Sequence, residues 1–544
     1  MTILTLFFFV IIMAIGGLAI DIGRVYGVHG QMQTYVDDLT LASASQLDAQ
    51  NNAVSRACDA ATGQAQCYWN GTPHGAPKGP IIRTSYSFTT SQMKVLNLVF
   101  LSALGSGGGP TPTASDTVLC VYDATSSTWT TKCPSSVDAS AKYVAVSSAP
   151  LSVTYVVLPI ADMFLGSNAM AGNSTLQLQA TAGYVQKTCA FTPLMICNPS
   201  EPAGNTNVNY PFNVPIGRQV KLTDASGNSN NWSPGNFGFI SPWSNAGGPC
   251  ASAGGGTNKQ LDCMLAAVDA QTQCLATNAT ANVQTGNSTP RYQAINVRFD
   301  IYENNALSPT NSNYAPAANV EKGVCVLKNG VCDYSQNSLC PNNANKFSGT
   351  STLTAPTVPL PRDKNASGTE CFTVDGSTNY PCGSGPIGVG VRTADLRTYW
   401  SKAHPSDPAL PPGLQTRWDV YRYEIQASQS GNTRDGIVNL SASGGENGNP
   451  TCASAAAPDN PNLDRRELFV AIVNCQAWNV HGNAVNPGIL AYLKVFMTEP
   501  IGYDANPPTA MSTSTNGTLY AEVRGLLTPN DKSGLVHSLA VLYR

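Results

Sequence analysis

The chain has 544 residues, of which only 12% are charged, and its formal net charge is −3. This balance excludes a nucleic-acid-binding surface, which needs clustered Lys and Arg. It also argues against binding to an anionic membrane surface. The length favours two or three domains. Few charges combined with abundant Asn, Thr, Ser and Gly are typical of a loop-rich, β-rich protein outside the cytoplasm.

An apolar run from Ile3 to Ile20 opens the chain, and the first charged side chain is Asp21. The run approaches the roughly 20 residues that a helix needs to cross a bilayer, and a chain in lipid must be helical to satisfy its backbone. We therefore expect one membrane-spanning anchor. A cleavable signal peptide is the alternative, because Gly17-Leu18-Ala19 resembles a cleavage site, although no Lys or Arg precedes the run. The anchor residues are Ile3, Phe7, Phe8, Phe9, Ile11, Ile12, Leu18 and Ile20.

Residues 21–57 contain no Pro and continue the helical pattern. Apolar side chains recur there in steps of three and four, which places them on one helix face that packs either on this chain's own sheet or on another helix. Asp21 and Arg24 stand three apart where the apolar run ends, and we expect them to be solvated or paired with each other. A buried role facing a partner helix is the alternative. The packing stripe consists of Val25, Val28, Met32, Tyr35 and Leu39.

Short β-branched or alternating runs follow and predict strands. In residues 58–190 they are Ile81–Thr90, Lys94–Leu101, Val118–Tyr122, Tyr143–Ser147, Ser152–Leu158 and Thr175–Thr181. In residues 191–544 they are Ala294–Tyr302, Gly388–Arg392, Asp419–Ile425, Leu468–Asn474, Leu490–Thr498 and Thr518–Val523, with one helix predicted over Leu261–Ala276. The fold class is α+β: an anchor helix (1–57), a smaller domain (58–190) and a larger β-rich domain (191–544).

All 16 cysteines lie after residue 50, their number is even, and no C-x-x-C motif occurs. Metal-site spacing is absent, so we expect disulfides and an oxidising compartment. Neighbours in sequence suggest the pairs Cys58–Cys67, Cys120–Cys133, Cys189–Cys197, Cys371–Cys382 and Cys452–Cys475. The connectivity of the others stays open: Cys250, Cys263, Cys274, Cys325, Cys332 and Cys340.

Signatures of catalysis are missing: the chain has no G-x-S-x-G elbow, no H-E-x-x-H and no phosphate-binding loop. We expect no catalytic residue, no metal, no cofactor and no small-molecule ligand. Asp224-x-Ser226-x-Asn228-x-Asn230 offers alternating oxygen atoms that could hold Ca²⁺, but an Asn/Ser turn is favoured. A pair of carboxylates could act as acid and base. The candidates for such a pair are Asp300, Glu303, Asp419, Glu424 and Glu499.

The N-terminal pattern Gly17-Leu18-Ala19-Ile20-Asp21-x-Gly23-Arg24-x-Tyr26 continues with Gln33, Asp37 and Leu41-Ala42-x-Ala44. It resembles the N-terminal segment of TadE/TadG-like proteins of the tight-adherence (Flp pilus) apparatus. Later segments look like the long, cysteine-containing TadG type. These segments are 193–199, 234–239, 298–302, 416–424 and 464–475.

The resemblance implies a pilin-like N-terminal helix and a minor pseudopilin-like assembly protein of the pilus machinery. It further implies a single-pass protein of the bacterial inner membrane, with its bulk in the periplasm or outside the cell, whose partners are other pilus-assembly or pilin-like proteins. Two other functions remain open: an adhesin that binds a glycan or a host surface, and an envelope hydrolase.

Overall fold

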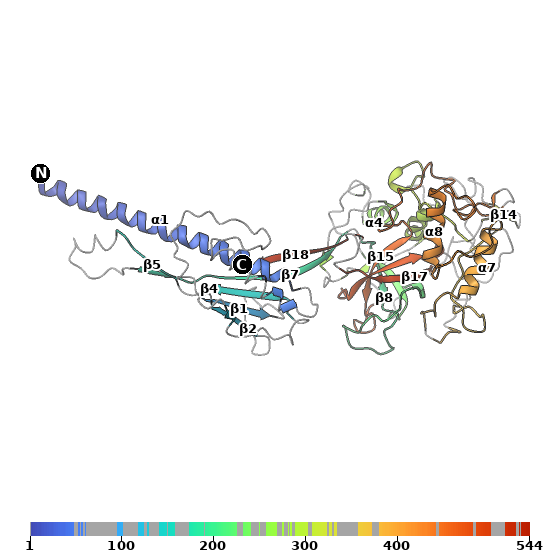
Figure 1. Cartoon of the computed structure of the whole chain (residues 1–544), viewed down its shortest axis with the longest axis horizontal. Coiled ribbons are helices and arrows are strands. Elements are labelled where there is room, and N and C mark those ends of the chain that lie inside the picture. Colours follow the sequence, from blue (N-terminus) through green and yellow to red (C-terminus); the bar gives the residue numbers. More distant parts are fainter. Residues whose placement is uncertain are drawn as a thin grey trace. The chain divides into compact units, whose positions relative to one another are not determined.

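A computed structural model describes most of the chain (Figure 1). The described residues are 2–47, 53–54, 56–57, 60, 95–101, 118–123, 128–129, 141–148, 151–157, 173–189, 191–225, 232–240, 250, 257–268, 275–276, 281, 283–284, 289–302, 307–323, 326–328, 331–333, 357–372, 380–383, 385–441, 445–481, 486–501, 517–528, 533 and 535–543.

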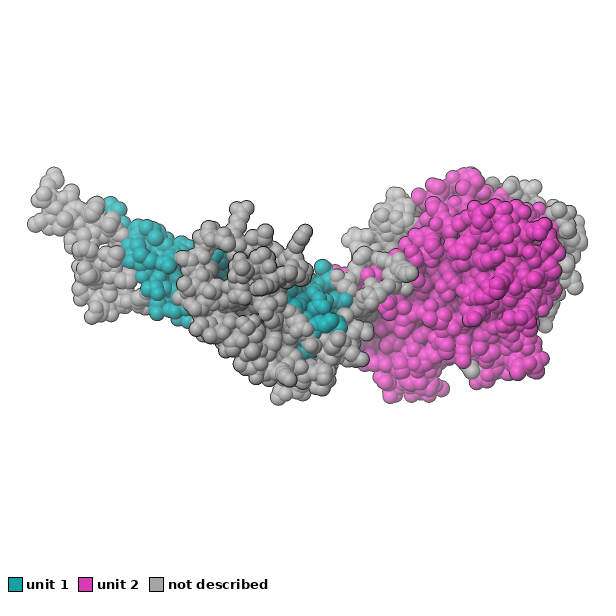
Figure 2. Space-filling model, in the orientation of Figure 1, with its two compact units in different colours: residues 1–186, 538–544 teal, residues 187–537 magenta. Residues whose placement is uncertain are grey.

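Two compact units make up the protein: residues 1–186 with 538–544, and residues 187–537 (Figure 2). The chain enters the second unit within β7 (Gln179–Thr188) and leaves it within β18 (Val536–Tyr543). Mixed helix and sheet content and a long N-terminal helix confirm the α+β prediction.

The first unit pairs one helix with one antiparallel sheet (Figure 1). Its helix, α1 (Thr2–Ala44), contains no Pro and is therefore uninterrupted. The strands are β1 (Val95–Leu101), β2 (Val118–Asp123), β3 (Thr128–Trp129) and β4 (Tyr143–Ser148), together with β7 and β18, and β5 (Leu151–Thr154) and β6 (Asn173–Leu176) form a separate hairpin. The strands predicted over 94–101, 118–122 and 143–147 are confirmed, whereas Ile81–Thr90 lies outside the described residues.

The predicted packing stripe of α1 lies on this chain's own sheet. Met32 and Leu39 are fully buried, and Val25 and Val28 lie at the edge of the same cluster. Their partners are sheet residues such as Leu98, Phe100, Val144 and Val146. The sequence stripe missed Val36, which is fully buried one turn after Met32, while the side chain of Tyr35 lies outside the described set.

Within the part of α1 whose side chains are described, and in every other described helix, no segment is both long and apolar enough to cross a membrane. The expected anchor side chains Ile3, Phe7, Phe8, Phe9 and Ile11 fall outside this part.

A mixed seven-stranded sheet forms the centre of the second unit, in the order β12-β10-β8-β15-β16-β17-β9. Strand β9 also pairs with β10, so the strands from β10 round to β9 form a closed ring. The strands are β8 (Leu194–Cys197), β9 (Gln219–Asp224), β10 (Asn236–Ile240), β12 (Val283–Gln284), β15 (Glu467–Val473), β16 (Ala491–Met497) and β17 (Thr518–Leu526). The predicted strands at 468–474, 490–498 and 518–523 are therefore confirmed.

Both faces of this sheet are covered, which explains its continuous apolar runs. In β15, Leu468, Val470 and Ile472 pack on one side, and the alternate residues Phe469, Ala471 and Val473 pack on the other. Helices α4 (Thr257–Ala266) and α5 (Thr289–Asn296) contribute to the first cluster. Helices α7 (Thr393–Ala403) and α8 (Arg417–Gln429) share a third cluster. The minor elements are β11 (Leu275–Ala276), β13 (Val326–Lys328), β14 (Val331–Asp333) and the 3-10 turns at 297–299 and 312–314.

Three strand predictions in this unit are wrong. Asp419–Ile425 is part of α8, because Thr416 and Asp419 form a reciprocal capping box that starts a helix there. Ala294–Tyr302 is the end of α5 and a 3-10 turn that closes at Asp300, whose φ is 60°. Gly388–Arg392 is a loop, and the residue before it, Ile387, forms an isolated bridge to Val220. The helix predicted over Leu261–Ala276 exists but ends at Ala266.

Candidate functional site

The N-terminal candidate site is the stretch of α1 around Asp21. The Asp21 carboxylate is only 1% exposed and accepts hydrogen bonds from the backbone N–H groups of Val156 and Val157, both at 2.9 Å. Arg24 donates to the Thr154 carbonyl at 3.4 Å. The expectation that the two residues pair with each other or are both solvated is therefore wrong for Asp21, which is buried and accepts two hydrogen bonds from the turn after β5, whereas Arg24 is exposed.

This turn also explains a glycine of the N-terminal pattern. A Cβ on Gly17 would overlap the Val157 side chain. Glycine is thus required where the turn approaches the helix backbone. Gly17 and Asp21, one helical turn apart, together fix α1 to the turn that follows β5.

The outward side of α1 is small and apolar. An added Cβ on Gly23, Gly27 or Gly30 would meet no atom within 4 Å, and Tyr26 between them is 73% exposed. These positions follow an i, i+3, i+4, i+7 pattern and share one helix face. The expected anchor residues Ile12, Leu18 and Ile20 are also exposed.

Disulfides brace the second unit, and one of the predicted pairs is confirmed, Cys371–Cys382. The predictions Cys189–Cys197 and Cys452–Cys475 are wrong, because Cys197 bonds to Cys475. Parallel pairing of β8 with β15 places Cys197 opposite Val473, so the sheet brings the distant cysteine close. Cys250 bonds to Cys263, and Cys189 and Cys452 are also disulfide-bonded. The remaining predicted pairs, Cys58–Cys67 and Cys120–Cys133, and the open Cys274, Cys325, Cys332 and Cys340 lie outside the described side chains.

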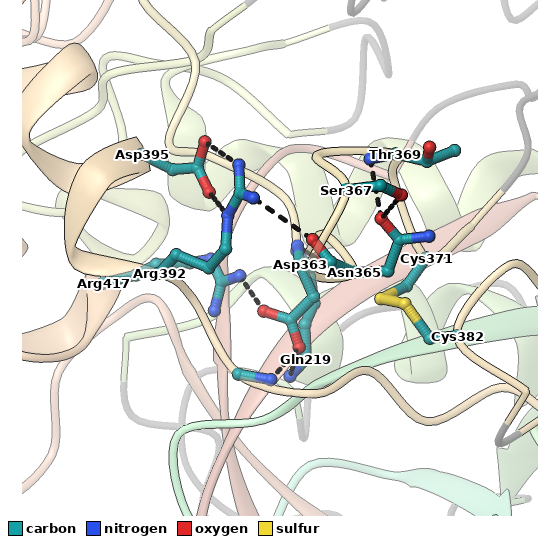
Figure 3. The surroundings of a disulfide bond; sticks show 11 residues. Gln219, Asp363, Asn365, Ser367, Thr369, Cys371, Cys382, Arg392, Asp395 and Arg417 are labelled. Atoms are coloured by element: carbon teal, nitrogen blue, oxygen red, sulfur yellow. Dashed lines mark hydrogen bonds and ion pairs between the residues drawn. A yellow bond between two sulfur atoms is a disulfide. The ribbon is translucent and has the colours of Figure 1, made fainter.

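A buried ion-pair cluster lies next to the Cys371–Cys382 disulfide (Figure 3). The fully buried Arg417, at the start of α8, pairs with Asp363 and, at 3.1 Å, with Glu522 of β17. Asp363 also accepts from the backbone N–H groups of Gln219 at 3.1 Å and Gly390 at 2.7 Å. Burial raises the pKa of Glu522, and Arg417 opposes that rise. The cluster ties α8, the sheet and the loop at 363 together.

A short hairpin, residues 364–370, follows Asp363 of this cluster. Lys364 and Glu370 bridge its two arms, and Asn365 accepts from the Thr369 N–H at 2.9 Å. Arg392 donates to the Asn365 carbonyl at 3.1 Å and pairs with Asp395 of α7, as Figure 3 shows. The ion-pair cluster, the disulfide and Arg392 thus hold the hairpin in place.

The hairpin forms one wall of a cavity of about 200 Å³. A strap of residues 357–362 and one side of α7 form other walls, with Glu499 after β16. Arg362 is held by Glu499 through Nε–Oε1 at 2.9 Å and Nη2–Oε2 at 3.1 Å, and its guanidinium lies 3.9 Å from the centre of the Tyr520 ring. Lys364 pairs with Asp395 at 3.5 Å.

Tyr399 lines the cavity and belongs to a buried polar network. Its hydroxyl is 2.6 Å from Glu321 and 2.8 Å from Glu424, which in turn contacts His404 at 3.1 Å. Burial raises the pKa of Glu321 well above its ordinary value, and repulsion by Glu424 and Glu446 adds to the rise.

The other carboxylates named as acid/base candidates have separate partners. Asp300 accepts from the N–H groups of residues 451–453, Asp419 caps α8, and Glu499 holds Arg362. Glu303 lies outside the described residues. Asp224 ends β9 and accepts from the Tyr292 hydroxyl, while the rest of the Ca²⁺ or turn motif is outside the described set. The sequence missed Glu321, Arg362 and Arg417, for which no motif gave a signal.

Comparison with protein families identifies the N-terminal segment. Residues 1–46 match the family model described as Putative Flp pilus-assembly TadE/G-like, which confirms the resemblance drawn from the N-terminal residues. No curated protein and no solved structure matches the chain. The resemblance of the later segments to the long TadG type stays a prediction.

Proposed function

We propose that this chain is a structural, non-enzymatic component of a Flp-type pilus assembly apparatus. Helix α1 would be the element that docks onto other pilus-assembly or pilin-like proteins, in a minor pseudopilin-like role. The observation that carries the proposal is the family match over residues 1–46, a segment that coincides with α1. The burial or pairing of the carboxylates described above supports a structural role for them.

The docking surface is the outward side of α1, because the opposite stripe is already covered by the chain's own sheet. Open positions at Gly23, Gly27 and Gly30 would let another helix backbone approach closely. The exposed Tyr26 would add a large contact at low entropic cost. The clamp at Asp21 would keep this face turned away from the sheet.

The apolar run from Ile3 to Ile20 would hold the chain in the inner membrane, with the rest of the first unit and the whole second unit on the periplasmic side. Its length supports a single span, and disulfides such as Cys197–Cys475 suit an oxidising compartment. Alkaline extraction of the host's membranes tests this step. A chain that is released into the supernatant, or recovered with its N-terminus near Ile20, would contradict the anchor.

Photo-cross-linking tests the docking surface directly. A photoreactive phenylalanine analogue at Tyr26 should cross-link in the native host to pilus-assembly or pilin-like proteins, identified by mass spectrometry. The same analogue at Ile216, which is 65% exposed in the second unit, is the matched control. Products at Tyr26 that are no more specific than those at Ile216 would contradict the proposal.

A substitution in α1 provides the second test. Gly27→Leu places a side chain in open space and improves helix propensity, so the melting temperature should not fall. The Tyr26 cross-link should nevertheless decrease strongly, because the close helix approach is blocked. His29→Leu changes an exposed residue on another side of α1 and should leave the cross-link intact.

A further inference from the structure

The turn that follows β5 lies beside the last helical turn of the apolar run in α1. Val157 is so close to Gly17 that an added Cβ there would overlap its side chain, and the N–H groups of Val156 and Val157 both donate to Asp21 at 2.9 Å. Gly17 precedes Asp21, the first charged residue, by about 6 Å along the helix. Whatever surrounds the end of the apolar run therefore also surrounds this turn.

The inference drawn from this placement rests on the membrane anchor proposed above. With the run from Ile3 to Ile20 in the hydrocarbon core, Gly17 lies just inside the edge of the core and Asp21 lies in the headgroup layer. That layer is about 5–8 Å thick on each side of a bilayer. The turn after β5 therefore reaches the level of the lipid headgroups, so that a second segment of the chain stands at membrane level beside α1.

The side chains at this level are apolar and open to their surroundings. Val156 is 56% exposed, and Leu18, Ile20 and Ile22 of α1 are 43%, 63% and 41% exposed. Exposed apolar side chains on two neighbouring segments indicate a contact surface. In the sequence, apolar residues continue beyond the turn, outside the described residues, at Leu158, Ile160, Met163, Phe164 and Leu165. An apolar surface that continues the membrane run fits a bilayer.

The polar groups of the turn are paired as a lipid-facing segment requires. Backbone N–H groups find no partner in lipid, so non-helical backbone at membrane level has to be paired within the protein. Asp21 provides this pairing for Val156 and Val157. The half-buried Tyr155 of the turn and the exposed Arg24, which donates to the Thr154 carbonyl, are residue types that anchor proteins at a membrane interface.

We propose that the turn at residues 155–157 is a second membrane contact, which lies in the headgroup layer of the periplasmic leaflet beside α1. Val156 faces lipid, and Asp21 keeps the backbone N–H groups of the turn paired. The contact is mainly apolar, so it does not need the attraction to anionic lipids that the low charge of the chain argues against. A helix anchor alone leaves the first unit free to tilt, whereas a second contact holds one side of this unit on the bilayer.

Quenching by brominated lipid tests the contact in the full-length protein. One fluorescent amino acid is placed at Val156, Ile12 or Leu539, all at least 52% exposed, so the melting temperature should not change. The protein is reconstituted in nanodiscs of phosphatidylethanolamine and phosphatidylglycerol, with or without phosphatidylcholine brominated near the top of its acyl chains. Leu539 is the matched control in the first unit, because β18 meets β7 at the end furthest from β5.

Quenching at Ile12 and Val156 should be at least twofold stronger than at Leu539. Quenching at Ile12 without quenching at Val156 overturns the turn contact and leaves the anchor intact. Absence of quenching at both positions overturns the anchor and this inference together. Equal quenching at Val156 and Leu539 also overturns the contact, because the lipid would then not distinguish the turn from the rest of the unit.

Photoreactive lipid provides a second measurement on the unmodified protein. The turn lies on the tryptic peptide 143–187, which has no internal Lys or Arg, and the apolar run lies on peptide 1–24. A lipid that carries a carbene precursor just below its headgroup should label both peptides in the same nanodiscs. Peptide 467–494, which contains β15 of the second unit, is the control and should stay unlabelled. Labelling of peptide 1–24 without labelling of peptide 143–187 overturns the proposal.

Discussion

We predict that Glu321, in the buried network of the second unit, holds a proton at neutral pH, and its replacement by Gln tests this. The Tyr399 hydroxyl lies 2.6 Å from Glu321 Oε2 and 2.8 Å from Glu424 Oε1. A tyrosine hydroxyl has one hydrogen to donate. It therefore donates to one carboxyl group and accepts from the other, and the group that donates must be protonated.

The neighbouring contacts identify which glutamate is protonated. Glu424 Oε2 accepts a hydrogen bond from the Asn319 amide at 2.7 Å, and its Oε1 lies 3.1 Å from His404 Nε2. Glu321 Oε1, in contrast, is buried without a partner. The proton therefore belongs to Glu321, in agreement with the burial-driven rise of its pKa.

The pH dependence of the free energy of unfolding follows from the one proton involved. The pKa of Glu321 is raised above its ordinary 4.5, so its contribution to stability is fully present below pH 4.5 and is lost as pH rises towards the folded-state pKa. Over that window the loss is about 1.4 kcal/mol per pH unit. Glu321→Gln carries a permanent N–H donor for the Tyr399 oxygen and does not titrate. As pH rises through this window, the free energy of unfolding of the variant should therefore increase relative to that of the unmodified protein by about 1.4 kcal/mol per pH unit.

Urea unfolding at about pH 5, 6 and 7 measures the slope, followed by tryptophan fluorescence, to which Trp400 and Trp418 of the second unit contribute. Glu446→Gln is the control. Glu446 accepts three backbone N–H groups, from Lys322 and Gly323 at 2.6 Å and Val358 at 2.8 Å. An amide N–H₂ would face one of these donors and destabilise by about 1–3 kcal/mol. A flat pH dependence for Glu321→Gln, or a loss like that of Glu446→Gln, would refute the proton assignment.

Three further predictions concern named contacts. Asp21→Asn replaces one acceptor oxygen by a donor, so backbone amide hydrogen exchange at Val156 and Val157 should accelerate, whereas unchanged exchange would show that the clamp contributes nothing. Replacing both Cys197 and Cys475 by Ser should cost about 2–5 kcal/mol in urea unfolding, and an unchanged midpoint would argue against the bond. Leu39→Ala should destabilise the first unit by about 2–5 kcal/mol, and a change below about 1 kcal/mol would indicate that the stripe of α1 is loosely packed.

The elements that the sequence predicted well are those with a strong local signal. The helical stripe of α1 and the three strands at 468–474, 490–498 and 518–523 show clear apolar patterns. The segment 419–425 instead carries Val, Tyr and Ile, residues typical of strands, yet it is helical. The capping box at Thr416 and Asp419 was a readable signal for the helix and outweighs propensity there.

Contacts between distant segments could not be predicted in this way. The Cys197–Cys475 bond spans a sequence separation of 278, and only the parallel pairing of β8 and β15 brings the two cysteines together. The cavity has the same origin, because Arg417 holds Asp363 at the base of the hairpin, and Lys364 and Arg392 join the hairpin to Asp395 of α7. Unpartnered atoms such as Thr357 Oγ1 become visible only once that geometry is known.

The low overall charge also gave no indication of which charged residues are buried or what they bind. Arg465 is buried and donates to the carbonyls of Ala266 and Ala267 at the end of α4, both at 2.7 Å, and to Ala315 at 3.0 Å. Arg298 donates to the next carbonyl, that of Leu265, at 2.9 Å. Cations at a helix C-terminus satisfy its free carbonyls and favour its dipole. The C-terminal end of α4 is therefore held by two arginines, which explains why these two charged side chains are buried.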